Sequence, residues 1–177
     1  MVTQGLVAAN ARLAKEGPTI PRLELVAGHT AANLLTNVRD ALIWFPVKSL
    51  YAWLDSTVAL HWIRGSGEYK QFVSNRVHKI REKTGITRRH ILSQENPSHL
   101  TSKGGLVKED NSLLWNGPIW LKEQDSWPAD IITVASPESN EEAKASNHIF
   151  ALAVESNDVM NELLLTSSLW RTLRVGA

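Results

Sequence analysis

A six-residue apolar run, Ser49 to Leu54, places the strongest limit on the fold of this 177-residue chain. Its aromatic and apolar composition is typical of a buried strand. The run stops at Asp55-Ser56-Thr57, and these residue types favour the N-cap position, which predicts that a helix begins there. A strand that leads directly into a helix indicates an α/β unit.

A long helix is predicted upstream of this run. Pro21 is acceptable in the first turn of a helix, and apolar residues recur after it with helical spacing as far as Leu42. The pattern predicts a helix over about 21–43. Before it, the apolar stretch Leu6 to Leu13 favours a strand, although its alanine-rich composition leaves a helix open.

The same alternation continues downstream. Gly65-Ser66-Gly67 ends the second helix, and the amphipathic stretch 69–80 predicts a third. Ile86 to Leu92 is typical of a short strand, and Asn96-Pro97 opens a brief helix that Gly104-Gly105 closes. The order strand, helix, strand, helix, strand, helix indicates an α/β layer with a parallel pair of strands.

Composition divides the chain into four segments. We expect a partial α/β domain over 1–105 and a Trp- and Pro-bearing extension over 106–134. Residues 135–160 are expected to form a linker, because the part from 135 to 147 is poor in large apolar residues. Residues 161–177 are expected to begin a following region. The predicted fold is thus α/β with a small, largely parallel sheet, followed by an irregular or helical acidic tail.

Charge is distributed unevenly, although the formal net charge is only +1. From Arg64 to Arg89 eight basic residues oppose two acidic ones, a local charge of +6. From Lys122 to Glu162 two basic residues oppose nine acidic ones, a local charge of −7. The basic stretch suits a surface that follows a phosphate backbone. A solvated basic face is the commoner explanation of such a stretch, and both interpretations stay open here.

Several classes of protein are excluded by what the sequence lacks. Without cysteine there is no disulfide framework, thiolate nucleophile or cysteine-based metal site. No apolar window reaches the roughly 18 residues of a membrane span, and the first residues do not resemble a secretion signal, so we expect no membrane partner and an intracellular location. No zinc-binding histidine pair, nucleophile elbow, phosphate loop or dinucleotide fingerprint occurs.

Two carboxylates, Asp55 and Glu24, are candidate catalytic or metal-binding residues. Asp55 follows a buried strand, the end at which such folds bind ligands, although it also suits the cap of the next helix. Glu24 lies between Leu23 and Leu25, where a negative charge near a helix N-terminus is itself favourable. If the two carboxylates meet, they suit a hard divalent cation such as magnesium. Their spacing in the sequence does not show that they meet.

Short motifs follow one another in a fixed order: Thr19-Ile20-Pro21-Arg22-Leu23-Glu24-Leu25, Trp53-Leu54-Asp55-Ser56-Thr57-Val58 with Trp62-Ile63-Arg64, Phe72-Val73-Ser74-Asn75-Arg76-Val77, Glu95-Asn96-Pro97, and Trp115-Asn116-Gly117-Pro118 with Trp120-Leu121. In this order they resemble the ribonuclease H-like region of BEL/Pao retrotransposon polyproteins. The resemblance runs from about Gly5 to Trp127. The segment from Ser167 to Val175 is similar to the one that leads toward the integrase part.

The resemblance implies a ribonuclease H-like fold in which four carboxylates hold two magnesium ions for cleavage of the RNA strand of an RNA–DNA hybrid. Glu24 matches the carboxylate of the first helix and Asp55 the one that ends the central strand, so both are implied catalytic and metal-binding residues. The first acid of the family lies upstream of the point where this chain begins, and His99 stands in place of the fourth. We therefore expect a fragment truncated at both ends, with little or no nuclease activity alone.

The resemblance also implies partners, namely an RNA–DNA hybrid or other nucleic acid and the remainder of the Pol polyprotein. The candidate nucleic-acid-binding residues are Arg76, Lys79, Arg81 and Lys83. A protein-interaction role is an alternative, for which the segment from Trp115 to Trp127 offers aromatic anchors. The absent first strand would leave Leu6 to Leu13 without its usual neighbour, so we expect this segment to be misplaced.

Overall fold

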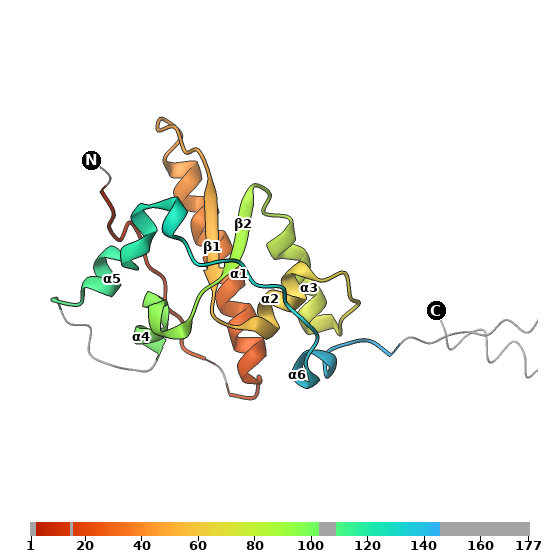
Figure 1. Ribbon diagram of the computed structural model, residues 1–177. Helices are drawn as coiled ribbons and strands as arrows, with labels where there is room; N and C mark the ends of the chain where they lie inside the picture. Colours follow the sequence, from red (N-terminus) through yellow and green to blue (C-terminus); the bar gives the residue numbers. More distant parts are fainter. Residues whose placement is uncertain (1–2, 15, 103–108, 146–177) are drawn as a thin grey trace, which may run out of the picture. The chain divides into compact units, whose positions relative to one another are not determined.

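A computed structural model describes residues 3–14, 16–102 and 109–145 (Figure 1). The predicted closure at Gly104-Gly105 and the apolar stretch over 161–177 lie outside these residues. Three short 3-10 turns, Ser93–Glu95, Ile119–Lys122 and Gln124–Ser126, accompany the other elements. These are, in chain order, α1 (Ile20–Ala41), β1 (Leu50–Leu54), α2 (Thr57–Arg64), α3 (Gln71–Arg81), β2 (Ile86–His90), α4 (Pro97–Ser102), α5 (Ser112–Asn116) and α6 (Pro137–Asn140).

The two described strands form a small parallel sheet. Its register runs from Leu50 opposite Ile86 to Leu54 opposite His90. The helices α2 and α3 connect the strands, because parallel neighbours need a crossover rather than a tight turn. The predicted parallel pair is therefore confirmed, and β1 and β2 are one and two residues shorter than the apolar runs that predicted them.

The hydrophobic core lies where α1, α2 and α3 meet. Leu25, Leu60, Trp62 and Val73 are fully buried, and burying an aliphatic side chain of this size contributes roughly 1.5–3 kcal/mol. Gly28 lets α1 approach the sheet closely, because a Cβ atom at this position would stand 3.1 Å from a methyl carbon of Leu54. The helix predicted over 21–43 is thus confirmed as α1, with its last turn ending slightly earlier.

The N-terminal segment over residues 3–14 contains neither strand nor helix. The prediction of a strand over 6–13 is therefore wrong, and Leu13 is 98% exposed. Leu6 donates its backbone N–H to the Trp115 oxygen at 2.8 Å, but the described strands pair only with each other. A strand needs a neighbour for its backbone groups, and the described strands give residues 6–13 none.

The Trp- and Pro-bearing extension folds onto β1. The Trp127 ring packs edge-on against Tyr51 and Trp53, with centroid distances of 4.7 and 5.1 Å. The Trp120 ring lies 5.8 Å from that of Trp53 and donates its indole N–H to Glu95 at 3.2 Å. These two tryptophans therefore form an aromatic cluster with the strand.

The chain then runs to α6, which packs on α2 (Figure 1). Trp62 donates its indole N–H to the backbone oxygen of Ser139 at 3.1 Å. Ser136 and Ser139 form a reciprocal capping box at the start of α6. Composition assigned residues 135–160 to a linker, but residues 136–144 are part of the packed unit, because Ser139 and Glu142 are buried. The segment boundaries beyond residue 145 stay predictions.

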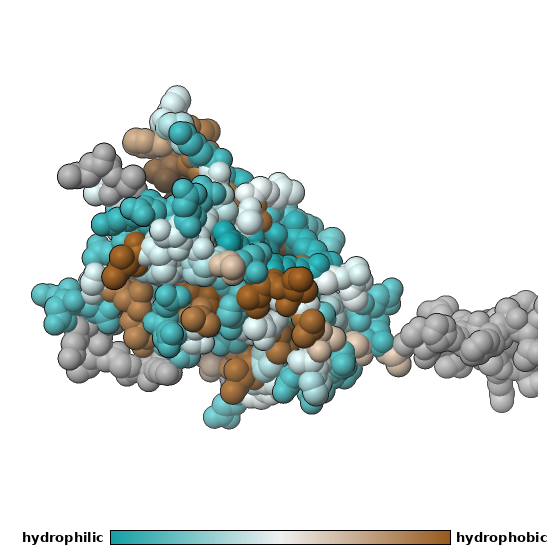
Figure 2. Space-filling view, in the orientation of Figure 1, coloured by the Kyte–Doolittle hydropathy of each residue, from teal (hydrophilic) through white to brown (hydrophobic). Residues whose placement is uncertain are grey.

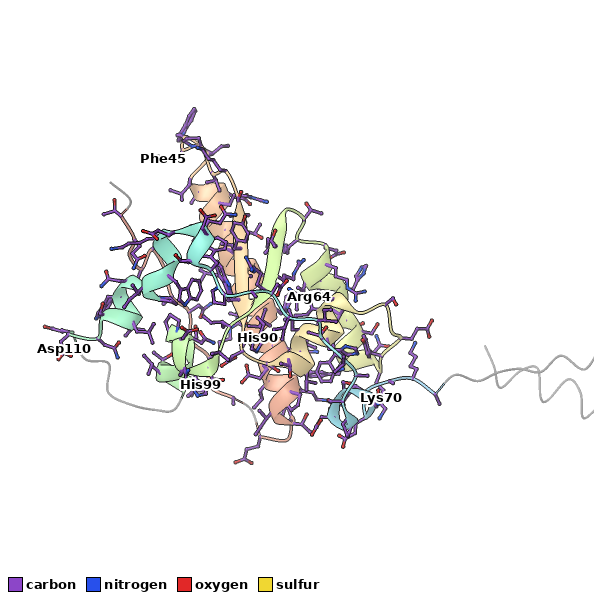
Figure 3. The ribbon with its side chains drawn as sticks, viewed as in Figure 1. Phe45, Arg64, Lys70, His90, His99 and Asp110 are labelled. Atoms are coloured by element: carbon purple, nitrogen blue, oxygen red, sulfur yellow. The ribbon has the colours of Figure 1, made fainter. Side chains whose placement is uncertain are left out.

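Exposed apolar side chains gather in the loop after α1. Ile43, Trp44 and Phe45 are mostly exposed. Figure 2 shows hydrophobic surface at the end of this loop, and Figure 3 shows Phe45 pointing away from the rest of the packed unit. No described helix is both long and apolar enough to cross a membrane.

Candidate functional site

Asp55 directly follows β1 and is free of the capping role that the sequence also allowed. Ser56 is the N-cap of α2, and its hydroxyl oxygen accepts the backbone N–H of Ala59 at 3.2 Å. The interpretation of Asp55 as the cap is therefore wrong, because the neighbouring serine satisfies that N–H. The Asp55 side chain is 12% exposed and lies at the carboxyl end of the parallel sheet.

Glu24 lies in the second turn of α1 and is half-buried. Burial raises the pKa of its carboxyl, the negative charge of Asp55 raises it further, and His99 acts in the opposite direction. An interaction of this kind requires the groups to be near one another. Helix α1 packs on β1, and Gly28, one turn after Glu24, closely approaches Leu54, the residue before Asp55. The structure thus places the two carboxylates that the sequence singled out on elements in contact.

His99 completes this group from a third element, α4 (Figure 3). Its Nδ1 atom lies 3.4 Å from Oδ2 of Asp55, a distance at which a protonated imidazole forms an ion pair. Glu24, Asp55 and His99, hereafter the carboxylate–histidine cluster, therefore come from the helix, the strand end and the short helix that the sequence motifs indicated.

The carboxylate–histidine cluster does not fit two magnesium ions. Magnesium takes oxygen ligands in a strict octahedral geometry, and the cluster supplies two carboxylates and an imidazole in contact with one of them. Two carboxylates bring two negative charges against the four positive charges of two such ions. Within the described residues no group of three or more histidine, aspartate or glutamate side chains is arranged to hold a metal ion.

Two arginines of the basic stretch serve as caps at the ends of helices. Arg81 donates to the backbone oxygens of Ile63 at 2.9 Å and Trp62 at 3.1 Å, and also to that of Gly65. Arg88 donates to the oxygen of Ile80 at 2.5 Å. Both cations thus satisfy carbonyl groups that the last turns of α2 and α3 leave without an intrahelical partner.

Two other arginines hold the chain that leads to α6. Arg64 pairs with Asp130 at 2.7 Å and donates to the Ile131 oxygen at 3.0 Å. Burial opposes ionisation of Asp130, but the hydrogen bond and charge of Arg64 lower the pKa of this carboxyl below its usual value. Arg89 donates to the Pro128 oxygen at 2.7 Å. The acidic part of the chain therefore partly neutralises the basic part.

The four predicted nucleic-acid-binding residues fall into two classes. Arg81 is the helix cap described above. Arg76 lies over the Phe72 ring, with its guanidinium carbon 3.5 Å from the ring centre. Lys79 and Lys83 have no side-chain hydrogen bond or ion pair within the described part of the chain. The lysines therefore present unneutralised charge, Arg81 is engaged as a helix cap, and Arg76 stacks on Phe72 with no carboxylate partner among the described residues.

A polar groove that sequence reasoning missed lies beside α1. Its volume is about 460 Å³, and its polar lining consists of Asn10, Arg12, His29, Thr30, Asn33, Asn37 and Arg76. The sequence shows no zinc-binding histidine pair, and His29 was assigned no role. The spacing of His29, Asn33 and Asn37, each four residues from the next, could have indicated a polar stripe along one face of a helix.

Comparison with known protein families gives a match to the first part of the chain. Residues 1–56 match the model of a family described as the Pao retrotransposon-like RNaseH-like domain. No curated protein and no solved structure matches the chain. The matched range contains Glu24 and Asp55 and supports a Pao-type ribonuclease H-like region there. The helices and the small parallel sheet are consistent with an α/β fold of that kind. The resemblance over 57–127 stays a prediction.

Proposed function

We propose that this chain is a ribonuclease H-like fragment of a Pao-type retrotransposon Pol polyprotein that binds nucleic acid and does not cleave an RNA–DNA hybrid by itself. One observation carries the catalytic half of this proposal. Where the resemblance places a fourth carboxylate, the imidazole of His99 stands 3.4 Å from the carboxylate of Asp55. The substitution replaces a negative ligand with a group that is neutral or positive.

The loss of charge explains why activity is expected to be absent. In the family chemistry two metal ions activate a water and stabilise the leaving oxygen. Glu24 and Asp55 are the residues of this chain that would hold such an ion. The imidazole contact competes for one oxygen of Asp55, and burial together with the neighbouring charge already disfavours the ionised form of Glu24.

The binding half of the proposal rests on the free lysines. Lys79 and Lys83 lie at and just beyond the end of α3, where no described carboxylate neutralises them. Phosphate contacts by such cations supply binding that does not depend on sequence and weakens with salt. An interaction role through the Trp115–Trp127 segment is less well supported, because Trp120 and Trp127 are engaged by β1.

Cleavage is tested with the full chain and a labelled RNA–DNA hybrid in the presence of magnesium. We expect no product above the level of Asp55→Asn, which is a suitable matched control because Ser56 and not Asp55 caps α2. Magnesium-dependent cleavage that disappears in Asp55→Asn would contradict the catalytic half of the proposal. Retention of the hybrid at low salt, with loss at high salt, tests the binding half.

A further inference from the structure

The polar groove lies on the opposite side of α1 from the carboxylate–histidine cluster. Asn33 follows Glu24 by nine residues, and at 3.6 residues per turn this separation places the two side chains about 180° apart around the helix. The groove is bounded by α1, by Arg76 on α3 and by Asn10 and Arg12 of the N-terminal segment. It is therefore a separate surface from the carboxylates.

The lining of this groove is polar and carries no acidic residue. Three asparagines contribute amide groups that both donate and accept hydrogen bonds. Asn33 contacts Nε2 of His29 at 3.3 Å, whereas the side-chain amides of Asn10 and Asn37 make no hydrogen bond within the described residues. The groove thus offers unused donors at the surface of a regular helix.

Two cations line the groove, Arg12 on the N-terminal segment and Arg76 on α3. Lys79 follows Arg76 by three residues and Lys83 by seven, so both lysines continue the same side of α3 beyond the lining. Burial lowers the pKa of His29, and the positive charges of Lys79, Arg76, Lys83 and Arg12 lower it further. The positive charges of all four residues therefore act on His29, a lining residue whose polar neighbours on its own helix are Thr30 and Asn33.

We propose that this groove binds the phosphodiester backbone of one nucleic acid strand, with Arg12, Arg76, Lys79 and Lys83 as the cations and the asparagine amides as hydrogen-bond donors. The proposal rests on the proposed function and gives it a location. No aromatic side chain lines the groove, so bases have no platform on which to stack and the strand is held by its backbone. The binding is accordingly independent of base sequence.

The experiment measures the affinity of the full chain for a fluorescent single-stranded oligonucleotide by polarisation over a range of salt concentrations. Four cations predict a slope of log affinity against log salt of about −3, since a single strand gives about −0.7 per neutralised phosphate. The double variant Asn33→Asp/Asn37→Asp places two negative charges in the groove with little change of shape. We expect it to weaken binding by at least about tenfold at low salt.

The matched control is Asn116→Asp/Asn140→Asp, which makes the same chemical change at exposed positions outside the groove lining. We expect its affinity to stay within about twofold of the original. An equal loss in both double variants would overturn the proposal, because it would show a response to net charge alone. Equally tight binding of a duplex of the same length that depends on the same asparagines would overturn the assignment to one strand.

A second variant protects the test against misfolding. Lys79→Gln/Lys83→Gln removes two side chains that have no described partners, and it should reduce the salt slope to about −1.4. An unchanged slope would overturn the proposal. If the original chain binds and all groove variants bind equally well, the groove is the wrong location and the proposed function stands. If the original chain binds no oligonucleotide at low salt, the binding half of the proposed function fails as well.

Discussion

The packing of helices α2 and α3 differs sharply from that of residues 3–14. Leu60, Trp62 and Val73 of the two helices are fully buried, whereas Leu13 and Val7 of the N-terminal segment are 98% and 76% exposed. The family match covers residues 1–56 and so includes the exposed segment but neither of these two helices. The match therefore covers the exposed segment together with α1 and β1, whereas the two helices that supply most of the buried side chains lie beyond it.

The largest loss of stability is expected from truncation of a side chain at the centre of the hydrophobic core. Trp62→Ala should lower the free energy of unfolding by about 3–5 kcal/mol, because it leaves a cavity and deprives the Ser139 oxygen of a donor. Leu13→Ala, the matched truncation of an exposed side chain, should change it by less than about 0.5 kcal/mol. Urea unfolding followed by circular dichroism measures both. Equal losses would show that residues 3–14 are packed more firmly than described.

A smaller effect is expected where the family-matched range meets the C-terminal part of the packed unit. Arg22 on α1 pairs with Oε1 of buried Glu142 at 2.7 Å, and Oε2 of that carboxylate has no partner in the described structure. Arg22→Ala leaves the carboxylate buried and unpaired, which should cost about 1–3 kcal/mol.

The control for this pair is Arg39→Ala on the same helix. Arg39 pairs with Asp40 at 2.8 Å, but both side chains are substantially exposed, so the loss should be at most about 1 kcal/mol. The same urea titration compares the two variants. If Arg39→Ala is the more costly, then the far end of α1 is held by contacts other than those described.

A third comparison separates the two kinds of cation on α3. Arg81→Gln removes donors from the end of α2 and should cost about 1–2 kcal/mol. Lys79→Gln should change stability by less than about 0.5 kcal/mol, since it removes no described contact. Thermal unfolding gives both values. A costly Lys79→Gln would mean that the lysine has a structural role and is not available to a ligand.

The smallest expected effect is a pH dependence at the border of the two regions. Burial and nearby cations lower the pKa of His29 in the folded chain, so the unfolded chain takes up the proton first as the pH falls below about 6.5. Stability should therefore fall as the pH is lowered through about 6.5, and the loss should end only below the lowered pKa of the folded chain. His29→Gln should flatten this part of the profile, and Lys79→Gln should flatten it less. A steeper profile for His29→Gln would contradict the assigned direction of the pKa change.

Local patterns predicted the elements that later packed on one another. The helix at 21–43 and the strand at 49–54 are present as α1 and β1 with small changes at their ends, because apolar periodicity directly reflects the buried face of an element. Glu24 and Asp55 are neighbours in space only because α1 packs on β1. The sequence identified both carboxylates as candidates but could not show that their elements pack together.

The predictions that the structure contradicts share one physical cause. Each concerns residues whose structure depends on partners far away in the sequence. The run from Leu6 to Leu13 has strand composition, yet a strand forms only when a neighbour satisfies its backbone. Arg81 reads as a free cation in the sequence because its partners, the last carbonyls of α2, lie 16 to 19 residues away. Residues 136–144 read as a linker because their anchors, Arg22 and Trp62, are far upstream.

Asp55 supplies a carboxylate at the end of the sheet, whereas Ser56 caps α2. This separation of roles affects which mutations the chain can tolerate. The hydroxyl of Ser56 holds the start of α2, so a substitution at Asp55 alters chemistry without removing a support of the fold. A substitution that removes the carboxylate and a substitution that weakens the start of α2 thus fall at adjacent but separate positions. The carboxylate at position 55 can therefore be lost by mutation while the serine at position 56 still holds the start of α2, so the fold can outlast whatever chemistry the carboxylate supplies.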